Sequence, residues 1–164
     1  MQMELILVES FKLLLRLFMN KYMELAVKQA RKGMKRGHGG PFGAVIVRKD
    51  KIVAFAHNTV LKDNDATAHA EMNVIRKACR KLHSYDLSDC EIYTTGQPCR
   101  MCIGAINWAK IKTVYFGNTY KDALNMGFDD EKGNNSDLKM IRLDSEHTVE
   151  LIDEWNNSNK RKIY

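Results

Sequence analysis

The stretches His69-Ala70-Glu71 and Pro98-Cys99-Arg100-Met101-Cys102 decide how this chain is interpreted. A catalytic zinc ion needs three protein ligands and one open position for water. His69, Cys99 and Cys102 supply three such ligands, and Glu71 lies two residues after the histidine as a candidate proton carrier. The spacing therefore predicts a hydrolytic site that holds one Zn2+ per chain.

Other interpretations of the cysteine pair are less consistent with the sequence. A C-x-x-C pair at a helix start, after a strand, is also typical of a redox site, and a structural zinc finger requires a second pair. The chain has no second C-x-x-C, and the upstream His-Ala-Glu favours a catalytic metal. Cys99 and Cys102 are predicted one turn apart at a helix N-terminus, where the helix dipole favours the thiolates that zinc requires.

Glu71 is predicted to be the general acid and base of this site. A glutamate in a first helical turn more commonly stabilises the helix dipole. Zinc, however, lowers the pKa of bound water from about 15.7 to about 7. A carboxylate two residues from a zinc ligand can take that proton and return it to a substrate.

Composition indicates one globular domain. The chain has 164 residues, of which 45% are hydrophobic and 28% charged. Two of its four cysteines belong to the motif, so we interpret Cys79 and Cys90 as small core thiols in a reducing, cytoplasmic compartment. The net charge of +6 admits an anionic partner, but the basic residues are scattered, with denser stretches only at 28–36 and 160–162. A solvated helix face explains the first stretch, so nucleic acid is not the expected partner.

The first 18 residues are predicted to be an extension of a domain that spans residues 19–164. Charged residues interrupt this apolar segment far short of the roughly 20 residues that a membrane span needs. No small-residue cleavage site follows it. We therefore expect neither a transmembrane helix nor a signal peptide, and the segment is either a longer first helix or the result of an early translation start.

Hydrophobic periodicity predicts helices alternating with strands. The stripe Ala70, Val74, Ala78 and Leu82 places His69 and Glu71 at a helix start. Helices are expected over 18–35, from about residue 69 to 82, over 98–110, 121–126 and 148–156; strands are expected over 44–47, 52–56, 91–95, 113–117 and 138–143. The first two strands are predicted to form a hairpin. The alternation of strands and helices along the chain predicts an α/β sandwich in which helices cover a sheet.

These motifs, together with Gly40-Pro41-Phe42-Gly43-Ala44, Asn58 and Gly104-Ala105-Ile106, make the chain resemble the cytidine deaminase superfamily. The resemblance runs from about Met19 to Tyr164 and implies a three-layer α/β/α sandwich with a central mixed sheet. Within the superfamily the chain is most similar to the small bacterial guanine deaminases. Trp108, the stretch 126–130 and the C-terminal tyrosine carry that similarity.

The resemblance implies hydrolysis of guanine to xanthine and ammonia, with Glu71 moving the proton. It implies that Asp130 acts at the substrate's ring nitrogens and exocyclic amine, and assigns further substrate contacts to Phe42, Asn58, Ala70, Trp108 and Tyr164. Each assignment has a simpler structural alternative. Phe42 and Trp108 could be core residues, Asn58 a turn residue and Asp130 a solvated loop charge.

The resemblance also implies a homodimer in which residues 144–164 cross to the partner and Tyr164 closes the partner's active site. From composition alone, the polar segment before Tyr164 would be expected to fray.

Two departures from the family pattern concern substrate preference. Gln97 stands where a glutamate is usual, and Ala66 stands where a proline is usual. Guanosine, cytosine or another aminated heterocycle, or the adenosine of a tRNA, therefore remain alternative substrates. A catalytically silent zinc-binding module is disfavoured by the intact Glu71.

Overall fold

The computed structural model describes residues 19–128 and 138–164, so the predicted extension over residues 1–18 lies outside the described part. Five strands form one mixed sheet in the order β2-β1-β3-β4-β5. The strands are β1 (Gly43–Arg48), β2 (Lys51–His57), β3 (Cys90–Gly96), β4 (Thr113–Asn118) and β5 (Lys139–Arg142). β1 runs antiparallel to β2 and β3, whereas β3, β4 and β5 are parallel.

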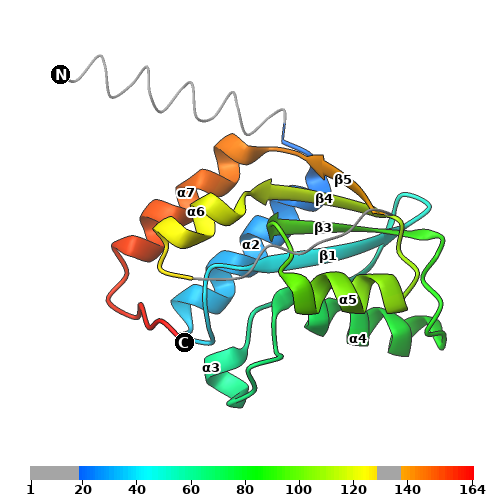
Figure 1. Cartoon of the computed structure of the whole chain (residues 1–164), viewed down its shortest axis with the longest axis horizontal. Coiled ribbons are helices and arrows are strands. Elements are labelled where there is room, and N and C mark those ends of the chain that lie inside the picture. The colour runs from blue at the N-terminus through cyan, green and yellow to red at the C-terminus, as the bar shows by residue number, and fades with distance from the viewer. Residues whose placement is uncertain (1–18, 129–137) are drawn as a thin grey trace.

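Helices cover both faces of this sheet, as expected for the sandwich (Figure 1). One face carries α4 (Ala70–Leu82) and α5 (Arg100–Trp108), and the other carries α2 (Lys21–Lys35) and α7 (Ser145–Asn156). Two short helices, α3 (Val60–Asp63) and α6 (Tyr120–Asn125), lie in connections. The three-layer α/β/α architecture predicted from the resemblance is confirmed.

The side chains of β1 alternate between the two faces of the sheet, so this strand packs against both helical layers. Ala44 and Ile46 point into the core below α4 and α5, while Val45 and Val47 pack against α2 on the other face. Successive side chains of a strand point to opposite faces, so a strand covered on both sides is apolar throughout. Gly43 lets α2 approach closely, because a Cβ there would lie 2.0 Å from the carbonyl oxygen of Ala26.

The element boundaries differ from the sequence expectations in small ways. Asn20 caps α2, its side chain accepting from the backbone N–H of Tyr22, so this helix begins at Lys21 rather than at residue 18. The final helix α7 begins at Ser145, three residues before the expected start. Helix α3 was not among the helices expected from the sequence. No helix within the described ranges is long and apolar enough to cross a membrane.

Candidate active site

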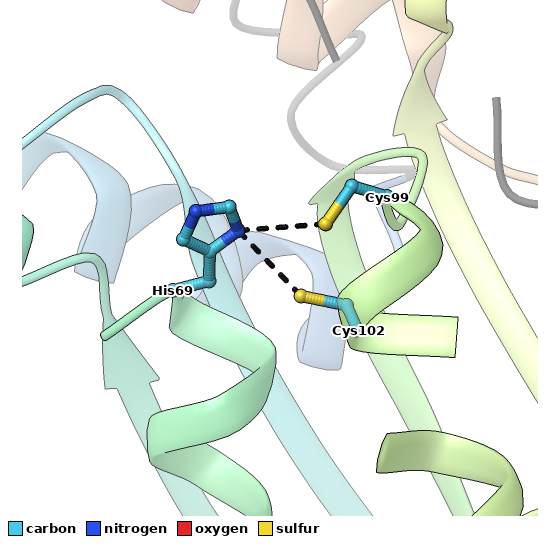
Figure 2. A group of neighbouring side chains, drawn as sticks. All are labelled: His69, Cys99 and Cys102. Carbon is cyan, nitrogen blue, oxygen red and sulfur yellow. Dashed lines mark hydrogen bonds between the residues drawn. The ribbon is translucent and has the colours of Figure 1, made fainter. Parts of the chain in front are cut away.

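The N-termini of α4 and α5 bring the predicted zinc ligands together. His69 is the N-cap of α4 and Cys99 the N-cap of α5, each with extended backbone. Cys102 follows one turn into α5 and is fully buried. Figure 2 shows the imidazole of His69 directed at both sulfur atoms from the neighbouring helix.

The distances within this group fit one zinc ion. His69 Nδ1 lies 3.7 Å from Cys99 Sγ and 3.6 Å from Cys102 Sγ, and the three ligand atoms lie within 4.8 Å of one another. Tetrahedral coordination with ordinary Zn–N and Zn–S bond lengths separates a nitrogen and a sulfur ligand by about 3.6 Å. The group therefore holds one Zn2+ per chain without rearrangement of the ligands.

The two thiols differ in acidity. A hydrogen bond from Cys102 lowers the pKa of Cys99 to about 4, against the effect of burial. The same hydrogen bond, together with burial, raises the pKa of Cys102. Zinc binding requires both sulfur atoms as thiolates, so metal affinity falls as the pH is lowered.

Glu71 lies beside the metal ligands in a setting that suits proton transfer. It is only 7% exposed, and its Oε2 accepts a hydrogen bond from Cys102 Sγ at 3.6 Å. Burial raises the pKa of Glu71 to about 7, although His69 acts in the opposite direction. A general acid or base works best when its pKa is close to the working pH.

A cavity of about 360 Å³ opens over His69, Glu71 and Cys99. Its aromatic wall is formed by Phe42, Phe128 and Tyr164. The ring of Phe128 meets that of Phe42 edge-on at 5.1 Å and that of Tyr164 at 5.3 Å. A cavity of this size accepts a small planar ligand.

Tyr164 reaches this cavity within its own chain. Its hydroxyl accepts a hydrogen bond from the backbone N–H of Gly40 at 2.8 Å. The preceding tail is attached by Lys160, which donates to the carbonyl of Lys35, and by Arg161, which donates to the carbonyl of Met126. The expectation from composition that this tail frays is wrong, because side chains and the terminal ring anchor it.

Asn58 lines the cavity and is almost fully buried. Its Oδ1 accepts from the backbone N–H of Val60 at 3.1 Å, so the residue also shapes the turn into α3. Gly39 leaves room for it, since a Cβ there would lie 2.0 Å from Asn58 Oδ1. Gln97 lines the cavity too, and its Oε1 accepts from the backbone N–H of Tyr120.

Two predicted substrate contacts do not face this cavity. Trp108 is the last residue of α5 and 86% exposed, so it does not wall the pocket of its own chain. Helix geometry explains this position. Trp108 follows Cys102 by six residues, so it lies about 9 Å farther along the helix axis and on another face of the helix. Ala70 is buried in the core against the sheet instead of lining the cavity. Asp130 lies outside the described residues.

Phe128 is a site residue that the sequence analysis did not single out. It is buried between Phe42, Tyr164 and Trp155, which explains how the turn after α6 joins the pocket wall. One signal was available, because an aromatic residue between a glycine and two aspartates is unusual for a solvated turn. Asp65 and Ala66 also line the mouth of the cavity.

A mixed sheet with a His/Cys/Cys zinc site and a buried glutamate beside it defines a zinc-dependent hydrolase of the deaminase class. The comparisons with known proteins agree. Residues 18–118 match the family of the cytidine and deoxycytidylate deaminase zinc-binding region, and the chain belongs to this family. It is a hydrolase that acts on C–N bonds in cyclic amidines.

Relatives of two substrate types are similar to this chain. Guanine deaminase of Bacillus subtilis (strain 168) is 50% identical over 109 residues, which cover 66% of this chain and 70% of that protein. A tRNA-specific adenosine deaminase of Buchnera aphidicola is 42% identical over 101 residues, covering 62% of this chain and 66% of the other. A solved guanine deaminase from Nitrosomonas europaea superposes with a TM-score of 0.78 at 25% identity, covering 84% of each chain.

Proposed function

We propose that this enzyme hydrolyses the free base guanine to xanthine and ammonia. The observation that carries the proposal is the aromatic cavity that Tyr164 helps to line. Phe42, Phe128 and Tyr164 surround a volume of about 360 Å³ above Glu71. This volume lies near the lower limit for small-molecule sites. A flat base is the substrate that such a cavity accommodates best.

The zinc ion, when held by His69, Cys99 and Cys102, supplies a Lewis acid that lowers the pKa of water. The residues of this chain perform the proton transfers. Glu71 takes a proton from the attacking water and delivers it to a ring nitrogen of guanine. Burial raises the pKa of Glu71, and a raised pKa suits a carboxyl group that both takes and returns a proton near neutral pH.

The balance of the reaction follows from this exchange. A C2–O bond forms from water, the C2–N bond to the exocyclic amino group breaks, and the second proton from water leaves with the nitrogen as ammonia. Phe42 would stack on the purine ring, and Asn58 would offer its amide to the polar edge. We retain Asp130 as the proposed partner of the ring nitrogens and the exocyclic amine.

A tRNA adenosine deaminase is the second candidate function. The similarity to tRNA-specific adenosine deaminases favours it. The tail argues against it, because a polynucleotide must lead away from the site through the space that Tyr164 occupies in this chain.

We further propose that the active enzyme is a homodimer in which the tail closes the partner's cavity. The contacts that Tyr164 makes with Gly40 and Phe128 within one chain are those that an exchanged tail would make in a second copy.

Ammonia release from a substrate panel tests the proposed reaction. Zinc-loaded protein would be given guanine, guanosine, cytosine, adenosine and tRNA in parallel. We expect guanine to be the preferred substrate and xanthine the product. Formation of inosine in tRNA, with guanine left intact, would contradict the proposal and support the second candidate.

A further inference from the structure

A second cavity, of about 290 Å³, lies on the opposite side of the connection between β2 and α3. Asn58 and Leu61 face the active site, whereas His57, Thr59 and Lys62 face this second cavity. Six basic residues from three helices line it. They are Lys32 of α2, Arg36 at the C-cap of α2, Lys62 of α3, and Arg76, Lys77 and Arg80 of α4.

The positive charge of this cavity is not balanced. Among the described residues that line the cavity, Asp63 is the only carboxylate, and it already lies 3.6 Å from Lys62. Elsewhere the chain pairs its cations closely, as Arg31 does with Glu150 and Glu154. Within the described residues, no carboxylate pairs with the lining residues Lys32, Arg36, Arg76, Lys77 and Arg80. A concave surface lined by one sign of charge concentrates its electric field and attracts counter-ions.

Two histidines show the effect of this field. His38 Nδ1 lies 3.0 Å from His57 Nε2, and the rings stack at the edge of the cavity. Burial, the neighbouring His38 and the cations Lys77, Lys32 and Lys62 lower the pKa of His57 to about 4. His57 is therefore neutral at pH 7, so it can share a hydrogen bond with His38 without like-charge repulsion.

This cavity is connected to the active site through Asn73. Its amide nitrogen donates to the carbonyl of His57 at 3.1 Å, to Thr59 Oγ1 at 2.9 Å and to the carbonyl of Ala68 at 3.2 Å. Ala68 directly precedes the zinc ligand His69. A ligand in the second cavity would lie beside Asn73, whose amide bonds the carbonyls of His57 and Ala68, the residues just before Asn58 and His69.

We propose that this cavity binds a small polyphosphorylated anion, of the class of nucleoside diphosphates and triphosphates, through its phosphate chain. Guanidinium and ammonium groups are the side chains that recognise phosphate oxygens. Six cations exceed what one phosphate neutralises, so a chain of phosphates fits better. The cations surround one hollow instead of following a stripe, as a polynucleotide backbone would require.

The test measures binding of inorganic tripolyphosphate and of nucleoside triphosphates to the zinc-loaded full-length protein by calorimetry at about 150 mM salt, where exposed charges are screened. We expect saturable binding of one anion per chain. The variant Lys32→Gln/Lys62→Gln should weaken it at least tenfold, since hydrogen bonds to charged groups are worth about 1.5–3 kcal/mol. The matched control Lys112→Gln/Lys121→Gln removes two exposed cations elsewhere and should bind as the wild type does.

A second readout reports on the cavity itself. Saturation with tripolyphosphate adds negative charge beside His38 and His57, so the NMR titration of His57 should move toward higher pH. Absence of saturable binding at this salt concentration would overturn the proposal, and so would equal losses in both double variants. Binding of a single-stranded RNA that tripolyphosphate does not displace would also overturn it, in favour of a nucleic-acid surface. These binding measurements do not depend on which base the enzyme deaminates.

Discussion

Backbone position, more than side-chain packing, places the three zinc ligands. His69 and Cys99 both occupy N-cap positions with extended backbone, where a residue has left the loop but has not yet entered the helix. Each ligand therefore projects from a helix end at the metal site. This arrangement explains why a short sequence motif was sufficient to predict the site.

Replacing one thiolate should remove the metal. We expect Cys102→Ser to lower bound zinc from about one per chain to a small fraction, because the hydroxyl is a poor replacement for a thiolate ligand. The matched control is Cys90→Ser, a buried cysteine in the core at 3% exposure, which should retain zinc. Metal analysis of protein purified without chelator provides the measurement. Full zinc content in Cys102→Ser would disprove the ligand set.

Replacing the proton carrier should separate binding from chemistry. Glu71→Gln keeps the size of the side chain but cannot accept a proton, so we expect kcat to fall by at least about a hundredfold. Zinc content and the unfolding midpoint should stay close to those of the wild type. Ammonia release and metal analysis of the same sample check both parts. Substantial turnover in a zinc-loaded variant would exclude Glu71 from proton transfer.

The pH dependence of stability should reveal His57. Its pKa is about 4 in the folded chain and 6.5 ordinarily, so between these values the unfolded chain binds a proton that the folded chain does not. Neutral His57 therefore makes its full contribution to the free energy of unfolding above pH 6.5. This contribution is lost as the pH falls toward 4.

We expect urea midpoints to fall between pH 7 and pH 4.5, and to fall less in His57→Gln. Zinc loss at low pH affects both proteins equally, so the difference between them isolates the histidine. Identical pH profiles in the two proteins would contradict the assignment.

At the scale of elements, the C-terminal tail is anchored so that one aromatic residue, Tyr164, lines the cavity. Tyr164→Ala should raise the KM for guanine about threefold to tenfold, because an aromatic contact of this kind is worth about 0.5–1.5 kcal/mol. Tyr164→Phe keeps the ring against Phe128 and loses the hydrogen bond from the backbone N–H of Gly40. We expect the KM of this variant for guanine to lie between those of the wild type and the alanine variant. Unchanged kinetics with guanine in Tyr164→Ala would show that the tail does not contribute to this cavity.

The sequence predicted the elements well wherever apolar periodicity was strong. The stripe on α4 and the hairpin of β1 and β2 agree with the structure. Helix α3 was missed because four residues are too few to show a period, and its Asn64 end in the left-handed conformation is set by the surrounding loop. Trp108 ends α5 exposed in the single chain, because a resemblance transfers residue identity but not the direction in which a helix presents it. Phe128 was missed because its neighbours come from α7 and the tail, far away in sequence.

At the scale of the whole molecule, the two ends of the domain are joined on one face of the sheet. The backbone N–H of Asn20 donates to Asp144 Oδ2 at 2.9 Å, and Arg31 of α2 pairs with Glu150 and Glu154 of α7. The tail that follows α7 then passes Lys35 to reach the cavity. The position of the tail therefore depends on the packing of α7 against α2, within one chain or between two.

Mixing the inactive variant Glu71→Gln with a tail-truncated variant should show whether the tail acts within a chain or between chains. Glu71→Gln has an intact tail and no proton carrier, whereas a chain lacking residues 161–164 retains Glu71 and lacks the end of its tail. If tails are exchanged in a homodimer, a mixed dimer holds one complete site, formed by the Glu71 of the truncated chain and the tail of the other. We expect co-refolded variants to recover up to about a quarter of wild-type activity, because random pairing makes half the dimers mixed and each of these has one complete site of two. Size-exclusion chromatography would establish the dimer in the same samples. Activity no higher than the sum of the separate variants would place the tail within its own chain, where Tyr164 already contacts Gly40 and Phe128.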